Sequence, residues 1–343
     1  MDLKNLIILS ITLLSLVFIF KKFNFLIDNV LFSDHKKIGI LNKSPIILGG
    51  IYFTFSIILL APEIFNTIKI ICILLLFLGL SSDKNYLTNP LIRLILQVFI
   101  LFILILNENL LIRSISVDLF DSYLEIKFVN IIFTLFCFAI LINGSNFLDG
   151  LNGLLSGYYL IALGSLVYLN FNSEEISLIN YDFINLIFMI VLLFFLLNIF
   201  GIVYLGDSGS YIISMIIGYI LIKESQINYN ISPYYIVLVL WYPAFENLFS
   251  LMRRSYKQKN VSVADKLHLH QLIFRYLKRK RVVDEKKTNT FTSLIILICN
   301  VPAFVVANLN YSHTMILVYM IFTYVIIYLL FYFYLISFFR KTL

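Results

Sequence analysis

The chain has 343 residues, of which 61% are hydrophobic and 13% charged, and its net charge is +7. This composition excludes an ordinary soluble domain and a disordered chain, and it is typical of a polytopic membrane protein. The three cysteines, Cys72, Cys137 and Cys299, lie far apart inside apolar runs, which excludes a disulfide framework and a zinc site.

Apolar runs of roughly 13–25 residues can cross a bilayer as helices, with tilt or as partial spans. Eleven such runs lie at about 3–20, 46–62, 66–80, 91–106, 129–147, 151–169, 183–200, 210–222, 233–250, 291–309 and 313–338. We therefore predict an all-α integral membrane protein, one domain over residues 1–343 with about 10–11 transmembrane helices. Because no small-residue cleavage site follows the first run, that helix is expected to be retained.

The placement of lysine and arginine predicts the orientation of the chain. With the N-terminus outside, all but five of the 26 basic residues fall on the inner, cytoplasmic side; the five are Lys4, Lys69, Arg113, Lys127 and Lys223. The inner side includes a basic loop at about 251–290, where helical spacing of apolar residues predicts an amphipathic helix on the anionic membrane surface. The charge suits lipid headgroups and phosphorylated substrates rather than nucleic acid.

The longest loop on the predicted outer side runs from Asn107 to Phe128. It alternates apolar and polar residues and carries three acids, Asp118, Asp121 and Glu125. Period-two alternation is typical of strands. This loop therefore predicts a short surface hairpin or another interfacial piece.

Polar, glycine-bearing motifs gather on the inner side in this topology. They are Gly79–Asp83, Asn143–Gly153, Gly206–Ser210, Pro243–Glu246 and Ala264–Gln271. Acids at a bilayer margin are costly, so they are candidates for function. Asn143, Asn146 and Asp149 recur every three residues and share one side if the segment is helical. The alternative is a plain helix–turn–helix corner.

Gly206-Asp-Ser-Gly-Ser210 places a carboxylate just before an apolar helix. Helix N-termini attract phosphate oxygens, and Mg²⁺ binds one or two carboxylates together with substrate phosphates. A metal site at Asp207 and a simple N-cap by Asp207 or Ser208 are equally supported by this segment. His268 and His270 would face one ligand only if their segment is extended, and the alternative for them is an ordinary polar position at the interface.

Together these motifs resemble the polyprenyl-phosphate N-acetylhexosamine-1-phosphate transferase family, glycosyltransferase family 4. The strongest matches are Asn143-x-x-Asn-Phe-Leu-Asp-Gly-Leu-Asn-Gly153 and Gly206-Asp-Ser-Gly-Ser210. The resemblance implies a multi-pass enzyme of the bacterial inner (plasma) membrane with a cytoplasmic active site. Such an enzyme transfers a hexosamine 1-phosphate from a UDP-sugar to polyprenyl phosphate, releases UMP and starts a lipid-linked surface glycan. A homodimer is left open.

The resemblance also implies roles for individual residues. Asp83, Asp149 and Asp207 would be catalytic, with Asp207 and Asn143 at a Mg²⁺ site, for which Mn²⁺ is an alternative ion. The substrates would be bound by the remaining polar residues of the motifs, namely Asn143, Asn146, Asn152, Lys36, Lys37, Glu246, His268 and His270. For Lys36 and Lys37, a role in topology alone is an equal alternative.

The chain departs from the family pattern at three places. Ser82 replaces the first Asp of an Asp-Asp pair, Glu246 replaces an Asp, and the histidine motif reads His-Leu-His-Gln. A phosphate monoester has a second pKa of about 6, so the lipid phosphate is a competent nucleophile without a strong base. We therefore expect an active enzyme. Two alternatives are an inactive member of the family and a transporter or lipid-handling protein.

Overall fold

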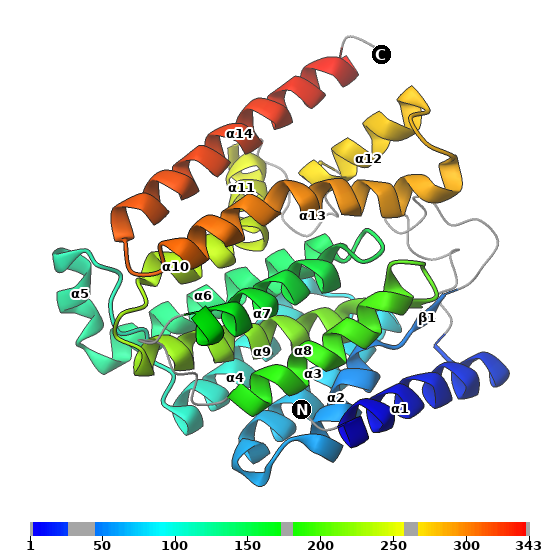
Figure 1. Cartoon of the computed structure of the whole chain (residues 1–343), viewed down its shortest axis with the longest axis horizontal. Coiled ribbons are helices and arrows are strands. Elements are labelled where there is room, and N and C mark those ends of the chain that lie inside the picture. Colours follow the sequence, from blue (N-terminus) through cyan, green and yellow to red (C-terminus); the bar gives the residue numbers. More distant parts are fainter. Residues whose placement is uncertain (1–2, 27–44, 173–180, 257–266, 341–343) are drawn as a thin grey trace.

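The computed structural model describes residues 3–26, 45–172, 181–256 and 267–340. This part of the chain is almost entirely helical, with two very short strands (Figure 1). The elements are α1 (Leu3–Lys22), β1 (Ile46–Ile47), α2 (Gly49–Leu60), the 3₁₀ turn η1 (Glu63–Phe65), α3 (Asn66–Asp83), α4 (Pro90–Glu108), α5 (Asp118–Leu124), α6 (Lys127–Leu148), α7 (Leu154–Asn172), α8 (Tyr181–Asn198), β2 (Val203–Tyr204), α9 (Gly206–Ile227), α10 (Pro233–Val239), α11 (Trp241–Tyr256), α12 (Leu269–Lys280), α13 (Glu285–Leu309) and α14 (Thr314–Arg340).

Each of the eleven predicted apolar runs coincides with helix. In the described part of the chain, eight helices are long and apolar enough to cross a membrane, or nine if α10 and α11, which meet at a bend of 75°, form one span. Helix α2, with 12 residues, is shorter. Helices satisfy their own backbone hydrogen bonds, which a lipid environment requires. The prediction of an all-α polytopic membrane protein is confirmed.

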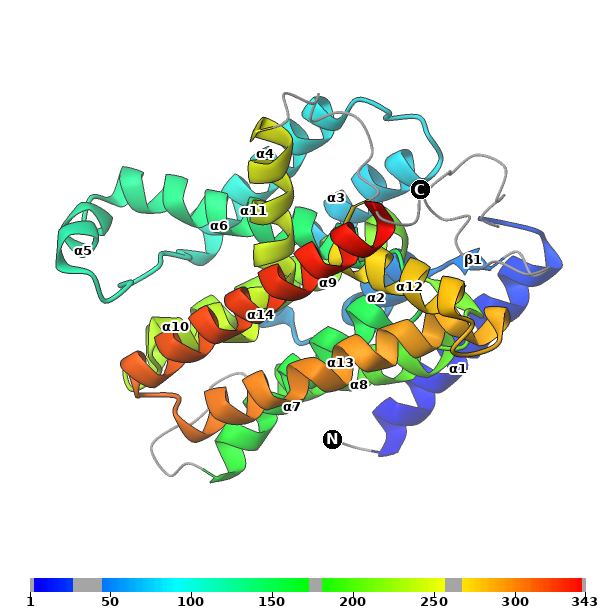
Figure 2. The same ribbon diagram turned by 90° about the horizontal axis from the view of Figure 1, so that it is seen from above.

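Helix α9 lies in the middle of the bundle (Figures 1 and 2). It packs against α2, α3 and α6, and nearly all of its side chains are buried. Its sequence is richer in Gly and Ser than a lipid-facing helix, since its neighbours are other helices rather than lipid tails. Small residues allow such close packing between membrane helices. The start of α9, at Gly206-Asp207, is therefore held from several sides.

The strands β1 and β2 pair in parallel, with Ile46 opposite Val203 and Ile47 opposite Tyr204. This pairing joins the start of α2 to the segment directly before α9. Gly206 follows with φ +70°, and a Cβ at this position would lie 2.4 Å from Ile47 Cγ2 and 2.8 Å from Asp83 Oδ2. Only glycine fits this conformation and this space. Figure 1 shows β1 and α12 toward one end of the bundle and α5 at the other.

Helix α5 lies in the loop for which the sequence predicted either a surface hairpin or another interfacial piece. The residues before α5 form a loop that the Asp121 carboxylate closes, because it accepts hydrogen bonds from Ser114 Oγ (2.6 Å) and from the Ile115 N–H (2.7 Å). Acids in the first turn favour a helix through its dipole. The hairpin alternative was wrong, because Asp118–Leu124 is a helix.

Helix α12 confirms the predicted amphipathic helix, but its surroundings differ from the prediction. Its apolar side chains Leu272, Ile273, Phe274 and Leu277 are buried, and the helix packs against α13 and α14. Lys278, Arg279 and Lys280 are exposed. The apolar face thus contacts protein instead of lipid, and only the basic face remains for the membrane surface.

Gly79 allows α3 to approach α9 closely, because a Cβ there would overlap the backbone of Ser208. Gly79→Ala is expected to lower stability by about 1–3 kcal/mol, since overpacking outweighs the better helix propensity of Ala. Thermal unfolding in detergent measures this effect. The matched control is Gly164→Ala on α7, whose Cβ would make ordinary contact with Phe188 at 3.6 Å. Equal melting temperatures for the two variants would contradict the prediction.

Candidate active site

The last residue of α3, Asp83, lies at the N-terminus of α9. Its Oδ1 accepts a hydrogen bond from the Asp207 N–H (2.8 Å), and its Oδ2 accepts one from Ser208 Oγ (3.1 Å). A carboxylate at this place satisfies free N–H groups and complements the helix dipole. The cap of α9 is therefore Asp83, from another helix, rather than Asp207 or Ser208 as the sequence suggested. This leaves the Asp207 carboxylate available for other partners.

The Asp207 carboxylate makes an ion pair with Arg93 of α4. Asp207 Oδ2 lies 3.1 Å from Arg93 Nη1 and accepts a hydrogen bond from Ser82 Oγ at 2.5 Å. Arg93 also donates to Ser82 Oγ. Both charged side chains remain partly exposed, with 26% of Arg93 and 18% of Asp207 accessible. The cluster Ser82, Asp83, Arg93 and Asp207 thus presents one cation and two carboxylates beside a helix N-terminus.

Asn143 reaches the same helix α4. It donates to the Ala139 carbonyl (2.8 Å) and contacts Gln97 Oε1 (3.4 Å). Gln97 follows Arg93 by one helical turn, so the two project from one face of α4. Asn143 and Asp207, the predicted metal pair, therefore approach α4 at adjacent positions. Asn146 follows on α6 and is half-buried.

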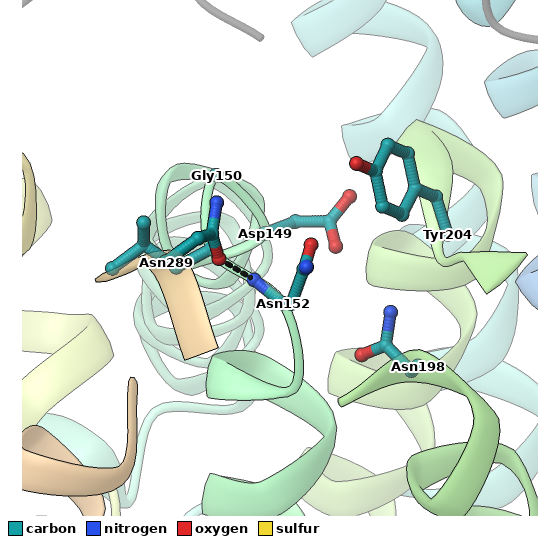
Figure 3. A pocket seen from close by; sticks show the side chains of 7 residues that line it. Asp149, Gly150, Asn152, Asn198, Tyr204 and Asn289 are labelled. Carbon is teal, nitrogen blue, oxygen red and sulfur yellow. Dashed lines mark hydrogen bonds between the residues drawn. The ribbon is translucent and has the colours of Figure 1, made fainter. Parts of the chain in front are cut away.

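A pocket opens where α6 ends and α7 begins (Figure 3). It is lined by Asp149, Gly150, Leu151, Asn152, Asn198, Tyr204 and Asn289. In Figure 3, the side chains of Asp149, Asn152 and Tyr204 point into the same space. Tyr204 precedes Asp207 by three residues. Asp149 and Asp207 therefore lie at the same end of the bundle, as the sequence predicted.

Carboxamide side chains from other helices hold the walls of this pocket. Asn289 Oδ1 accepts a hydrogen bond from the Asn152 N–H at 2.7 Å. Asn198 Oδ1 accepts from the Gly153 N–H (3.0 Å), while its Nδ2 donates to the Val203 carbonyl (2.8 Å). These bonds fix the turn Asp149–Gly153 against α8, β2 and α13. Hydrogen bonds from three separate segments therefore hold the turn that forms this pocket.

The histidine motif lies beside this turn. His268 is extended and precedes α12, whereas His270 is in the first turn of α12, and their rings stack with centroids 5.6 Å apart. His268 Nδ1 lies 2.9 Å from Oε1 of Glu246, and its ring lies 4.5 Å from that of Phe147. A Cβ on Gly150 would lie 3.5 Å from His270 Nε2. Glu246 and both histidines thus join the end of the Asn143–Gly153 segment.

Most of the predicted site residues meet at one end of the bundle. Lys36 and Lys37 lie outside the described residues. The sequence analysis missed Arg93, Gln97, Asn198, Tyr204 and Asn289 as site residues. Arg93 and Gln97 carry a signal, since they are polar side chains one turn apart in an otherwise apolar run. Asn289 carries none, because nothing in its own segment marks it.

The donors at this site are oxygen atoms, which suit a hard cation. Among the described residues, no group of three or more His, Cys, Asp or Glu side chains could hold a metal ion by itself. Mg²⁺, however, is commonly bound by one or two carboxylates plus substrate phosphates. The Asp207 carboxylate and the Asn143 amide therefore fit such an ion only when a phosphorylated substrate completes its coordination.

Comparisons with known proteins support the interpretation of the motifs. Residues 64–225 match the model of glycosyl transferase family 4. The undecaprenyl-phosphate alpha-N-acetylglucosaminyl 1-phosphate transferase of Yersinia pestis is 25% identical over 233 residues, 67% of this chain and 64% of the relative. The protein of the same name from Escherichia coli O157:H7 is 24% identical over 261 residues, 70% of each chain. The match thus spans slightly less than two thirds of the Yersinia relative. Both comparisons confirm the predicted family resemblance.

Proposed function

Because residues 64–225 match the model of glycosyl transferase family 4, we propose that this chain transfers an N-acetylhexosamine 1-phosphate from a UDP-sugar to undecaprenyl phosphate. The products are UMP and a lipid-linked sugar diphosphate that starts a surface glycan. The reaction takes place at the cytoplasmic face of a bacterial plasma membrane. One observation carries the proposal: the Asp83-capped N-terminus of α9 brings Asp207 and Arg93 together beside the pocket of Asp149.

This arrangement suits phosphoryl transfer, which depends mainly on positioning and on stabilising negative charge. Arg93 offers a guanidinium that can bind phosphate oxygens in two-pronged fashion. Asp207 and Asn143 would hold Mg²⁺, which supplies charge neutralisation to the diphosphate when bound. Once a diphosphate is present, it competes with Asp207 for Arg93. The ion pair at 3.1 Å therefore holds both charges in place before the substrate binds.

We place the nucleotide in the pocket shown in Figure 3. The Tyr204 ring offers a stacking surface for a uracil base, and Asn152, Asn198 and Asn289 carry amide groups around it. Asp149 lines this pocket, and the next residue, Gly150, lies beside His270. A base bound there directs the diphosphate toward Asp207, since Tyr204 and Asp207 belong to one short segment.

An apolar groove between α6, α9, α10 and α11 suits the polyprenyl chain of the acceptor. Its walls include Phe136, Leu141, Val237 and Leu240, and its inner end reaches Ile140 and Ala244. Ile140 is three residues from Asn143, and Ala244 is two residues from Glu246. An isoprenoid chain in this groove would therefore place its phosphate near the cluster. The bend of 75° between α10 and α11 lies beside Leu240, which lines the groove.

The proposal is tested with purified protein, undecaprenyl phosphate and a panel of UDP-N-acetylhexosamines, with Mg²⁺ and after its removal by EDTA. UMP release and the mass of the lipid product are measured. We expect a sugar-diphosphate lipid from at least one donor, only with the divalent ion. An absence of UMP release with every donor would refute the proposal and favour an inactive family member. Lipid movement without any chemistry would favour a transporter.

Tyr204→Leu is expected to raise KM for the UDP-sugar about 10-fold with little change in kcat, because stacking on an aromatic ring contributes roughly 1–3 kcal/mol per base. Tyr204→Phe keeps the ring and is the matched control, with KM within about twofold of the parent. Steady-state kinetics at saturating acceptor measure both. If the two variants raised KM equally, the hydroxyl rather than the ring would bind the donor.

A further inference from the structure

Helix α14 carries no motif, yet two of its tyrosines are buried toward α11. Tyr328 and Tyr332 are one helical turn apart and are 2% and 3% exposed. Most of the large apolar side chains of α14 are exposed instead, including Phe322, Ile326, Leu330 and Phe333. A lipid-facing helix does not require buried phenols. Their contacts therefore indicate that α14 does more than anchor the chain in the membrane.

Tyr328 is bonded to the carboxylate of Glu246, which is 1% exposed. The Tyr328 hydroxyl donates to Oε2 at 2.9 Å, while Oε1 accepts from the Leu269 N–H at 3.2 Å and lies 2.9 Å from His268 Nδ1. Hydrogen-bond donors from α14, from the start of α12 and from the residue before it thus converge on one buried carboxylate. Such a group is costly without these partners.

The Glu246 carboxylate determines the tautomer and the orientation of the His268 imidazole. Next to an acceptor, Nδ1 must carry the proton, so Nε2 is the nitrogen directed away from Glu246. Phe147 and His270 contact the ring at centroid distances of 4.5 and 5.6 Å. These contacts leave the ring little freedom, so the rotamer of Glu246 sets both its tautomer and its orientation.

We propose that Tyr328 is a positioning residue for the transfer reaction. By holding Oε2 of Glu246, its hydroxyl keeps Oε1 on His268 and thereby aims the second nitrogen of His268 toward the Asn143–Gly153 segment. Arg253 assists from the other side, since it donates to the Leu267 carbonyl (2.6 Å) and to the Tyr332 hydroxyl (2.6 Å). The catalytic part of this inference rests on the proposed function, whereas the geometry does not.

Loss of the Tyr328 hydroxyl should release Oε2 of Glu246 and let the carboxylate turn away from His268. Other polar and charged groups around this pair are Tyr242 and Arg253 on α11, His270 on α12 and Tyr332 on α14. Tyr328→Phe leaves all of these in place, so its effect reports this one hydrogen bond.

The first experiment compares Tyr328→Phe with Tyr324→Phe, a tyrosine one turn earlier whose hydroxyl donates to the Cys299 carbonyl. For Tyr328→Phe we expect kcat to fall about 10-fold, with KM for the UDP-sugar within about twofold. Tyr324→Phe should match the parent in both. Equal kcat values for the two variants would overturn the inference.

A double-mutant cycle shows whether Tyr328 acts through His268. If it does, adding Tyr328→Phe to His268→Gln causes no further loss, whereas multiplied losses would overturn the inference. Nitrogen-15 NMR of histidine-labelled protein gives a readout without substrates, because the chain has only four histidines. The Nδ1-protonated tautomer of His268 should dominate in the parent and lose population in Tyr328→Phe. Unchanged spectra would overturn the inference alone, whereas absent UMP release with the expected spectra would overturn the proposed function alone.

Discussion

Asp207→Asn is expected to reduce UMP release at least about 1,000-fold, while the protein still folds. The substitution keeps the size of the side chain and can still accept the Ser82 hydrogen bond, but it removes the charge that pairs with Arg93 and would bind Mg²⁺. Because Arg93 is 26% exposed, water compensates much of its lost partner, so the melting temperature should change little. Initial rates over a range of Mg²⁺ concentrations measure the effect.

Ser82→Ala is the control for this prediction. It removes the neighbouring hydroxyl that bridges Arg93 and Asp207, and it leaves both charges in place. We expect a loss of less than about 10-fold, because the ion pair between Arg93 and Asp207 persists without the hydroxyl. Near-normal turnover of Asp207→Asn would show that the metal assignment is wrong. A loss of equal size in Ser82→Ala would show that the hydroxyl, rather than the carboxylate, carries the function.

Arg93→Gln is expected to lower kcat roughly 100-fold, the second largest effect. Arg93 is the one cation in an ion pair with Asp207 among the described residues, so a diphosphate bound beside Asp207 would meet this guanidinium. Arg93→Lys keeps the charge but not the planar fork, so it should recover only part of the rate. Steady-state kinetics of both variants, together with thermal unfolding, separate charge from geometry.

The result for Arg93 also bears on the role of Ser82. With Ser82 in place of a second carboxylate, Arg93 has Asp207 and the Ser82 hydroxyl as its polar partners, at 3.1 and 2.5 Å. The guanidinium is therefore less neutralised than it would be beside a pair of acids. If Arg93→Gln were as active as the parent, Arg93 would serve only to hold Asp207, and the phosphates would have to be bound elsewhere.

The sequence predicted a large part of the fold because a membrane-spanning helix can be identified from the hydrophobicity of its own segment. Each apolar run became a helix, and the polar motifs ended up near one another, since a motif at a helix end stays at that end. The prediction for the loop on the predicted outer side was wrong in part. Period-two alternation in Asn107–Phe128 suggested a hairpin, whereas Asp121 closes the loop through Ser114 and Ile115 ahead of α5. The alternation of apolar and polar residues does not reveal that a side chain in the helix bonds the loop before it.

The sequence predicted those site residues that belong to a short polar motif, namely Asp83, Asn143, Asp149 and Asp207. Residues that enter the site from otherwise apolar helices were missed. In the sequence, Arg93, Asn198 and Tyr328 are isolated polar residues in apolar runs. Their partners become known only when the helices are packed. Helical periodicity says which side chains share a face of one helix, but it does not say which helix stands opposite.

The amino-acid sequence by itself determined that this is a many-helix membrane protein that resembles glycosyl transferase family 4, with acids and amides at one margin. The tertiary structure decided that Asp83 caps α9, that Asp207 pairs with Arg93, and that Tyr328 holds Glu246 against His268. The physical reason is that the tendency of a segment to enter the lipid depends on its own composition, so it can be read from that segment alone. The pairing of charges and hydrogen-bond donors depends on which helices pack together, and only the folded chain settles that.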